Sequence, residues 1–227
     1  MEKFSKIQKR AIERKLGKSN LSELMPKPAS KKQLIALPNS VYLAEMTKKI
    51  FQSGFVWRVV ENKWPGFEEV FWGFEPHKLE LASDEQIERM AQDKRIIRNF
   101  TKVKSVRDNA FFIQEISEKN GSFGEFVAEW PAEEITLLWL YLKKHGSRLG
   151  GNTGPYFLRT VGKDTFLLTR DVVQYLIGQN LINKHPTSQR DLKLVQAAFN
   201  DWHQQSGCSF SEISRTIACS IGENYSE

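Results

Sequence analysis

The amino-acid sequence predicts an all-α fold, and three observations predict it. Apolar residues recur at about every 3.6 positions through most of the chain after residue 41. Several of these segments begin with helix-capping residues. No alternation of apolar and polar residues persists long enough to build a sheet. With 227 residues, 40% of them hydrophobic, the chain is long enough to bury a real core.

The first forty residues are predicted to form a basic helix and an arm. Residues 3–18 can form an amphipathic helix, and the prolines within residues 21–40 exclude a long helix there. Residues 1–32 hold ten Lys and Arg against three Asp and Glu, a net charge of +7, whereas the other 195 residues sum to −1. We therefore divide the chain into a basic arm, residues 1–40, and a helical domain, residues 41–227. The arm either binds phosphates or docks on the core.

The helical domain is predicted to contain many short elements. Helices are expected at residues 42–61, 67–74, from Ser83 onward, and at 99–119, 122–129, 132–144, 155–161, 171–179, 188–205 and 210–221. Pro65 and Gly66 are expected to break the chain between the first two. Ser83 and Gln86 have the spacing of a capping box.

A glycine-rich hairpin, near residues 146–161, is the most informative segment. Its glycines allow backbone N–H groups to approach an anion closely, and Pro155 suits the first turn of the helix that follows. A phosphate is the expected anion. The residues expected to bind it are Arg148, Gly151, Asn152, Thr153 and Gly154. The alternative is a plain turn between two capped helices.

An acidic residue follows an apolar run downstream of this hairpin. Asp171 comes directly after residues 165–170 and begins a predicted helix. A carboxylate in this position can be held in a cleft, where it stabilises positive charge or activates water. The alternative is that Thr169 caps the helix and Asp171 is only a charge in its first turn.

Four stretches share the pattern of one known family. They are Phe51-Gln-Ser-Gly-Phe-Val-Trp57, Phe67-Glu-Glu-Val-Phe-Trp-Gly-Phe-Glu-Pro76, Asp93-Lys-Arg-Ile-Ile-Arg-Asn99 with Lys102, Asn109 and Ala110, and Gly121-Ser-Phe-Gly-Glu-Phe126. Through them, residues 46–130 resemble the DNA-3-methyladenine glycosylase I family, within the helix-hairpin-helix DNA glycosylase superfamily. The third stretch is the most specific.

The resemblance implies a two-lobed helical fold and a base-excision-repair enzyme. Such an enzyme binds double-stranded DNA with a damaged base, here of the alkylated class, flips the base into a cleft and hydrolyses its N-glycosidic bond. It implies that Trp57 stacks on the base and that Gln52 and Gly54 shape the pocket wall. We expect Asp171 to assist catalysis. The enzyme is expected to be monofunctional, because no lysine clearly occupies the hairpin position of members with lyase activity.

The chain also departs from the family. Lys49 stands where the family has a glutamate that reads the cationic base, and a lysine repels that charge. The chain therefore acts on a different lesion, or it is a non-catalytic DNA-binding protein of the same fold. A helical protein-interaction domain is the third reading. The family's zinc site is not expected, because Cys208 and Cys219 lack matching histidines. No other cofactor is expected.

The sequence also bears on location. No stretch approaches the ~20 apolar residues of a transmembrane helix, and the charged N-terminus lacks the apolar centre of a secretory signal. The two cysteines suit a reducing compartment. A cytoplasmic monomer without membrane contact is the expectation.

Overall fold

Every regular element that the computed structural model describes, over residues 1–222, is a helix, which confirms the all-α prediction. The last five residues of the predicted helical domain lie outside this range. The chain divides into two compact units. The first unit contains Met1–Ala29, Pro131–Leu138 and the described residues from Gly162 onward, and the second contains Ser30–Trp130 and Trp139–Val161. Within residues 1–222, none of the helices has the length and apolarity needed to cross a membrane.

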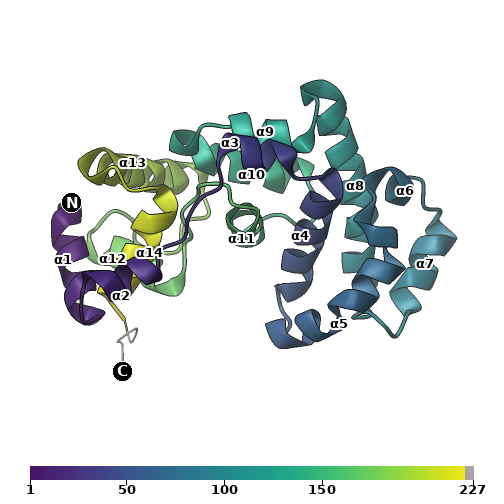
Figure 1. The fold of residues 1–227 in the computed structure, drawn as a ribbon, viewed down its shortest axis with the longest axis horizontal. Coiled ribbons are helices and arrows are strands. Elements are labelled where there is room, and N and C mark those ends of the chain that lie inside the picture. Colours follow the sequence, from purple (N-terminus) through teal and green to yellow (C-terminus); the bar gives the residue numbers. More distant parts are fainter. Residues whose placement is uncertain (223–227) are drawn as a thin grey trace. The chain divides into compact units, whose positions relative to one another are not determined.

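The first unit combines helices from the beginning of the chain with helices from the described part beyond residue 161. Its helices are α1 (Phe4–Arg14), α2 (Lys18–Glu23), η2 (Ala132–Glu134), α12 (Arg170–Gly178), α13 (Gln189–Ser206) and α14 (Phe210–Ser220). The apolar side of α1 is buried, and α1 packs along α14 (Figure 1). In the core, the rings of Phe166 and Phe199 stack with centroids 4.0 Å apart. The predicted basic helix is therefore packed within this unit.

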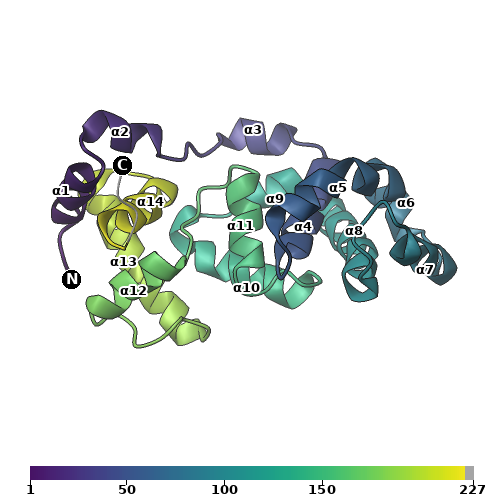
Figure 2. The same cartoon turned by 90° about the horizontal axis from the view of Figure 1, so that it is seen from below.

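The second unit is organised around its longest helix, α8 (Phe100–Asn120). Helices α4, α6, α7 and α9 all contact α8, while α3 packs on α9 and α11 packs on α4 (Figure 2). Together with α5 and η1, these helices have the bounds α3 (Lys31–Ala36), α4 (Asn39–Gln52), α5 (Trp57–Val70), η1 (Trp72–Phe74), α6 (Pro76–Glu80), α7 (Asp84–Gln92), α9 (Phe123–Glu129) and α11 (Thr153–Thr160). Helix α10 (Ile135–His145) begins in the first unit and ends in the second.

The prediction of a single helix over residues 42–61 is wrong, because the helix ends before residue 61 and a second one begins. Helix α4 ends at Gln52 and α5 begins at Trp57, with Gly54 at a φ of +87° between them. A glycine adopts this left-handed conformation without strain, so the chain leaves the helix there. The predicted break at Pro65 is also wrong, since Pro65 lies inside α5.

Close packing explains Gly66, which follows that proline. A Cβ atom on Gly66 would lie 2.6 Å from the carbonyl oxygen of Arg95, so this residue lets two backbone segments approach. The neighbouring Trp64 ring stacks with those of Phe67 and Phe74, with centroids 5.4 and 5.3 Å away. Tertiary packing therefore maintains the helix despite the proline.

Capping residues predict the starts of helices better than Pro65 predicts a break. The capping box of Ser83 and Gln86 is present at the start of α7. The segment between residues 21 and 40 contains no long helix, but it includes the short helix α3, which Ser30 and Gln33 cap in the same way. The helix expected from Pro155 starts two residues earlier, at Thr153.

Replacing Phe199 by alanine is expected to lower the free energy of unfolding by about 3–5 kcal/mol, because deleting a buried ring leaves a cavity. Urea denaturation followed by circular dichroism measures the change. The control is Leu194→Ala on the same helix, whose side chain is 47% exposed. That control is expected to change stability by less than about 0.5 kcal/mol. Equal effects of the two substitutions would contradict the assigned core.

The Glu2 carboxylate predicts a pH-dependent contribution to stability. It accepts hydrogen bonds from Arg10, at 3.0 and 2.9 Å, and from the Tyr175 hydroxyl, at 2.8 Å. The hydrogen bonds from Arg10 hold the pKa of Glu2 below its ordinary value. A carboxyl group whose pKa is lowered by folding stabilises the protein above its unfolded pKa, and this contribution is lost as the pH falls through the folded pKa.

Glu2→Gln is therefore expected to lower the thermal midpoint at pH 7, and the difference from the unsubstituted protein is expected to shrink toward pH 3. Thermal unfolding across this pH range measures it. Glu13→Gln on α1, the helix that also carries Arg10, is the control, because the Glu13 carboxylate is largely exposed. A difference that stays constant with pH would refute the role given to Glu2.

Candidate functional site

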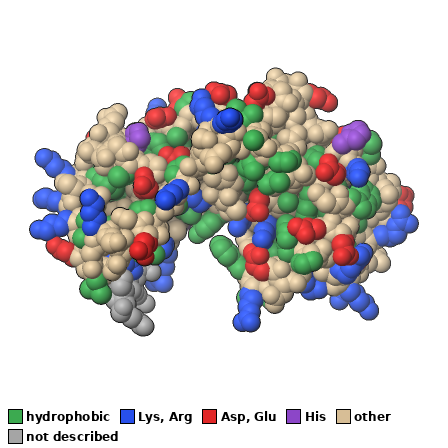
Figure 3. Space-filling view, viewed as in Figure 1, with side chains coloured by type: hydrophobic (Ala, Val, Ile, Leu, Met, Phe, Trp, Pro, Cys, Tyr) green, Lys and Arg blue, Asp and Glu red, His purple; other side chains and the backbone are tan. Residues whose placement is uncertain are grey.

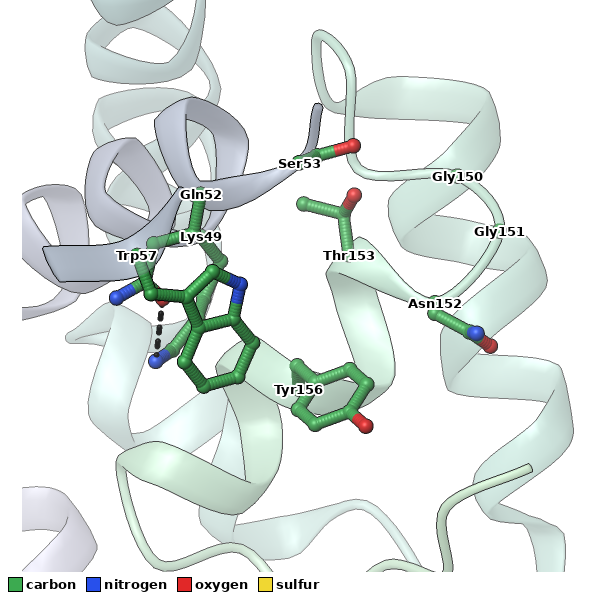
Figure 4. Close-up of a pocket in the computed structure, with 9 residues that line it drawn as sticks. All are labelled: Lys49, Gln52, Ser53, Trp57, Gly150, Gly151, Asn152, Thr153 and Tyr156. Atoms are coloured by element: carbon green, nitrogen blue, oxygen red, sulfur yellow. Dashed lines mark hydrogen bonds between the residues drawn. The ribbon is translucent and has the colours of Figure 1, made fainter. Parts of the chain in front are cut away.

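A pocket of about 280 Å³ lies within the second unit (Figure 4). One wall comes from the end of α4 and the start of α5, and the other from the glycine hairpin and α11, which packs on α4. The lining residues are Lys49, Gln52, Ser53, Trp57, Gly150, Gly151, Asn152, Thr153 and Tyr156. Two aromatic rings, one ammonium group and a glycine-rich backbone thus face one space.

A chain of polar contacts fixes the α4 side of the pocket. The Lys49 ammonium donates a hydrogen bond to Gln52 Oε1 at 3.0 Å (Figure 4). Gln52 is buried, and its amide nitrogen donates to Glu61 Oε1 at 2.9 Å. The other oxygen of Glu61 pairs with Lys48 at 2.9 Å. Because both ends of the Gln52 amide are occupied, its orientation is fixed.

The aromatic part of the pocket consists of Trp57 and Tyr156. Their rings meet edge to face, with centroids 6.0 Å apart and planes at 89°. Trp57 is 51% exposed, which is unusual for the largest apolar side chain. The Lys49 ammonium lies 5.3 Å from the centre of its ring, within the range of a cation–π contact. Burial lowers the pKa of Lys49, against the opposing attraction of Glu45 and Glu61.

Lys102, on α8, holds the turn that presents Trp57. Its buried ammonium donates to the carbonyl oxygen of Ile50 at 2.8 Å and also to the carbonyl of Ser53. The last carbonyl groups of a helix have no partner within the helix, so this lysine satisfies the end of α4. Burial, together with the nearby Arg148, lowers the pKa of Lys102.

Asn109, two turns further along α8, holds the opposite wall. Its side-chain nitrogen donates to the carbonyl of Ser147 at 3.0 Å, and its side-chain oxygen accepts from the Ser147 N–H at 2.8 Å. This pair of bonds fixes the start of the glycine hairpin. Within the hairpin, Arg148 and Gly151 both have positive φ, +62° and +59°.

The hairpin leads directly into the first turn of α11. A Cβ on Gly154 would lie 2.7 Å from the carbonyl oxygen of Leu149, so a glycine is required for this close approach. The Thr153 N–H donates to Gly150, and Pro155 has no N–H to offer. Gly154 therefore contributes the remaining backbone N–H of this turn. An anion is favoured at such a position.

The structure brings together most of the site residues predicted from the sequence. Those that line the pocket are Lys49, Gln52, Trp57, Gly151, Asn152 and Thr153. Gly54, Arg148 and Gly154 do not line it, and they shape the adjacent turns instead. The prediction missed Ser53, Gly150 and Tyr156. The signal available for Tyr156 was its place in the first turn after the glycine cluster.

Asp171 belongs to the first unit, whereas every residue lining the pocket belongs to the second. Thr169 caps α12 by accepting a hydrogen bond from the Val172 N–H, and Asp171 is the acidic residue of the first turn. This is the local arrangement of the alternative in which Thr169 caps the helix and Asp171 is only a charge in its first turn. A Cβ on Gly222 would lie 2.8 Å from an Asp171 oxygen, so the end of the described chain packs against this carboxylate. Its catalytic role stays a prediction.

Two further observations concern the predicted basic arm and the zinc site. Lys and Arg side chains gather over the α1 end of the first unit (Figure 3), but their role stays a prediction. Within residues 1–222, no group of three or more His, Cys, Asp or Glu is placed to hold a metal ion, and Cys208 and Cys219 are free thiols.

Comparison with known proteins agrees with the resemblance found in the sequence. The family model for methyladenine glycosylases matches residues 40–146. The fold is similar to that of the 8-oxoguanine DNA glycosylase of Methanocaldococcus jannaschii, with 16% identity over 94% of this chain and 92% of that one and a TM-score of 0.55. It is also similar to 3-methyladenine DNA glycosylase I of Staphylococcus aureus, with 20% identity over 61% of this chain and 80% of that one and a TM-score of 0.50. No curated protein sequence matches the chain.

Asn109→Ala is expected to lower the free energy of unfolding by about 1–3 kcal/mol, because it leaves backbone groups of the hairpin without their partners. Hydrogen exchange is expected to accelerate at residues 147–154. Chemical denaturation and amide exchange measure the two effects. Asn120→Ala, at the exposed end of the same helix, is the control, with an expected change below about 0.5 kcal/mol. Unchanged exchange in the hairpin would show that Asn109 does not hold it.

Proposed function

We propose that this chain is a base-excision-repair DNA glycosylase and a divergent member of the methyladenine glycosylase family, because residues 40–146 match the model of that family. It hydrolyses the N-glycosidic bond of a damaged base in double-stranded DNA, and the family relation points to the alkylated class. The observation that carries the proposal is one pocket lined by both Trp57 and the glycine hairpin.

Base binding is assigned to the aromatic part of the pocket. An extruded base stacks on aromatic side chains and exposes its polar edge to hydrogen-bonding groups. Trp57 provides the exposed ring, and Tyr156 supports it at its edge. Gln52 and Lys49 supply the polar end, where a fixed hydrogen-bond network costs little reorganisation when a base arrives.

Backbone binding is assigned to the glycine hairpin. Gly151 and Asn152 are exposed, and Gly151 has no side chain that could block a phosphate. The remaining backbone N–H at the start of α11, that of Gly154, favours an anion. Arg148, also exposed, adds positive charge. Contacts of this kind position DNA without reading its sequence.

Catalysis is assigned to Asp171. Cleavage of the N-glycosidic bond leaves positive charge on the sugar, and water then adds to its anomeric carbon while the base departs with a proton. A carboxylate stabilises that positive charge or takes a proton from the attacking water. The reaction is monofunctional in this scheme, because water and not an amine displaces the base. The protein acts as a cytoplasmic monomer.

Asp171→Asn is expected to lower single-turnover base release by about 10²–10⁴-fold, the range for loss of a general base. Duplexes carrying one alkylated, deaminated or oxidised base serve as substrates, and binding to a duplex with an abasic analogue is expected to persist. Asp191→Asn is the matched control, because Asp191 is the acidic residue in the first turn of α13. Equal release by the Asp171 variant and its control would contradict the assignment.

The same assays separate the alternatives. Salt-dependent binding to abasic duplex without release of any base would identify a non-catalytic DNA-binding protein. The absence of salt-dependent DNA binding would instead favour a protein-interaction domain.

A further inference from the structure

We infer that the pocket selects uncharged bases that present a carbonyl oxygen and disfavours bases that carry a positive charge. This inference rests on the proposed glycosylase function, and it replaces the alkylated class, to which the family relation points, with a different substrate class. Deaminated and oxidised bases with a new carbonyl group belong to the selected class, whereas cationic alkylated bases such as 3-methyladenine do not.

The first observation is the charge of the pocket lining. Lys49 is the one charged side chain among the nine residues that line it. Its ammonium has three N–H donors, and one of them is used by the Oε1 atom of Gln52. The other two can be offered to a ligand. A lysine ammonium commonly binds the carbonyl and ring-nitrogen acceptors of a purine.

The second observation is that the side-chain oxygens of Gln52 and Glu61, along the α4 wall, are already in use, and that no carboxylate lines the pocket. Gln52 Oε1 accepts from Lys49, while the two oxygens of Glu61 accept from Gln52 and pair with Lys48. Glu45 attracts Lys49 electrostatically but does not line the pocket. A cationic base therefore meets an ammonium group and no carboxylate.

The third observation concerns the face of Trp57. A cationic base gains most from stacking on an electron-rich ring. The Lys49 ammonium already lies 5.3 Å from the centre of this ring, so it competes for the same attraction. An uncharged base loses little by this competition, because its stacking depends on surface contact. All three observations favour the same class of base.

The test compares binding of two purine lesions in the same duplex. One duplex contains hypoxanthine, which is uncharged and has a carbonyl, and the other contains 3-methyladenine, which is cationic and has none. A 2′-fluoro substituent on the lesion's sugar slows cleavage, so that dissociation constants can be measured. The unsubstituted protein is expected to bind the hypoxanthine duplex at least about tenfold more tightly, because like charges placed together cost more than about 1.4 kcal/mol.

Lys49→Glu is expected to abolish or invert this preference. Lys78→Glu is the matched control, since it makes the same change of charge on the exposed side of α6 and should retain the preference. Tighter binding of 3-methyladenine by the unsubstituted protein, or an unchanged ratio in Lys49→Glu, would overturn the inference while leaving the glycosylase proposal intact. If neither lesion is bound better than undamaged duplex, this inference fails. The glycosylase proposal fails with it only if no alkylated, deaminated or oxidised base is released in the assays described above.

Discussion

Two polar side chains buried on one face of α8 hold both walls of the pocket. Lys102 satisfies the carbonyl groups at the end of α4, and Asn109 pairs with both backbone groups of Ser147 in the hairpin. They are seven residues apart, about two turns of helix, so they project from the same side. Burying an ammonium and an amide costs free energy unless each is satisfied, and backbone groups satisfy both here. The relative position of the pocket walls is thereby tied to a single rigid helix.

The sequence predicted those parts of the fold that depend on neighbouring residues. The cap of α7 at Ser83 was found because a capping side chain bonds to an N–H within three positions. The end of α4 was missed because its carbonyl groups are satisfied by Lys102, about fifty residues away along the chain. Pro65 misled for a similar reason, since α5 continues through it while the next residue, Gly66, packs against the backbone of Arg95 on a distant segment of the chain.

In the candidate site too, the sequence predicts some residues and misses those whose position depends on distant parts of the chain. Gln52 and Trp57 were identified through the family pattern, and Lys49 was identified as a departure from it. Tyr156 was missed, because its place in the pocket depends on how α11 packs against α4. For Asp171, the local pattern allowed both a cleft carboxylate and a first-turn charge. The capping by Thr169 is local chemistry, while the carboxylate's function depends on the bound substrate.

The lysine bonded to the end of α4 also has a consequence for the order of folding. A chain that has emerged only as far as α7 contains every residue of the Trp57 turn but not the ammonium group that satisfies its carbonyls. Water must bond to these groups until α8 has formed and docked, because contacts distant in sequence form only after the intervening loop closes. The tryptophan of the pocket therefore acquires its orientation late, when the helix that supports both walls is already in place.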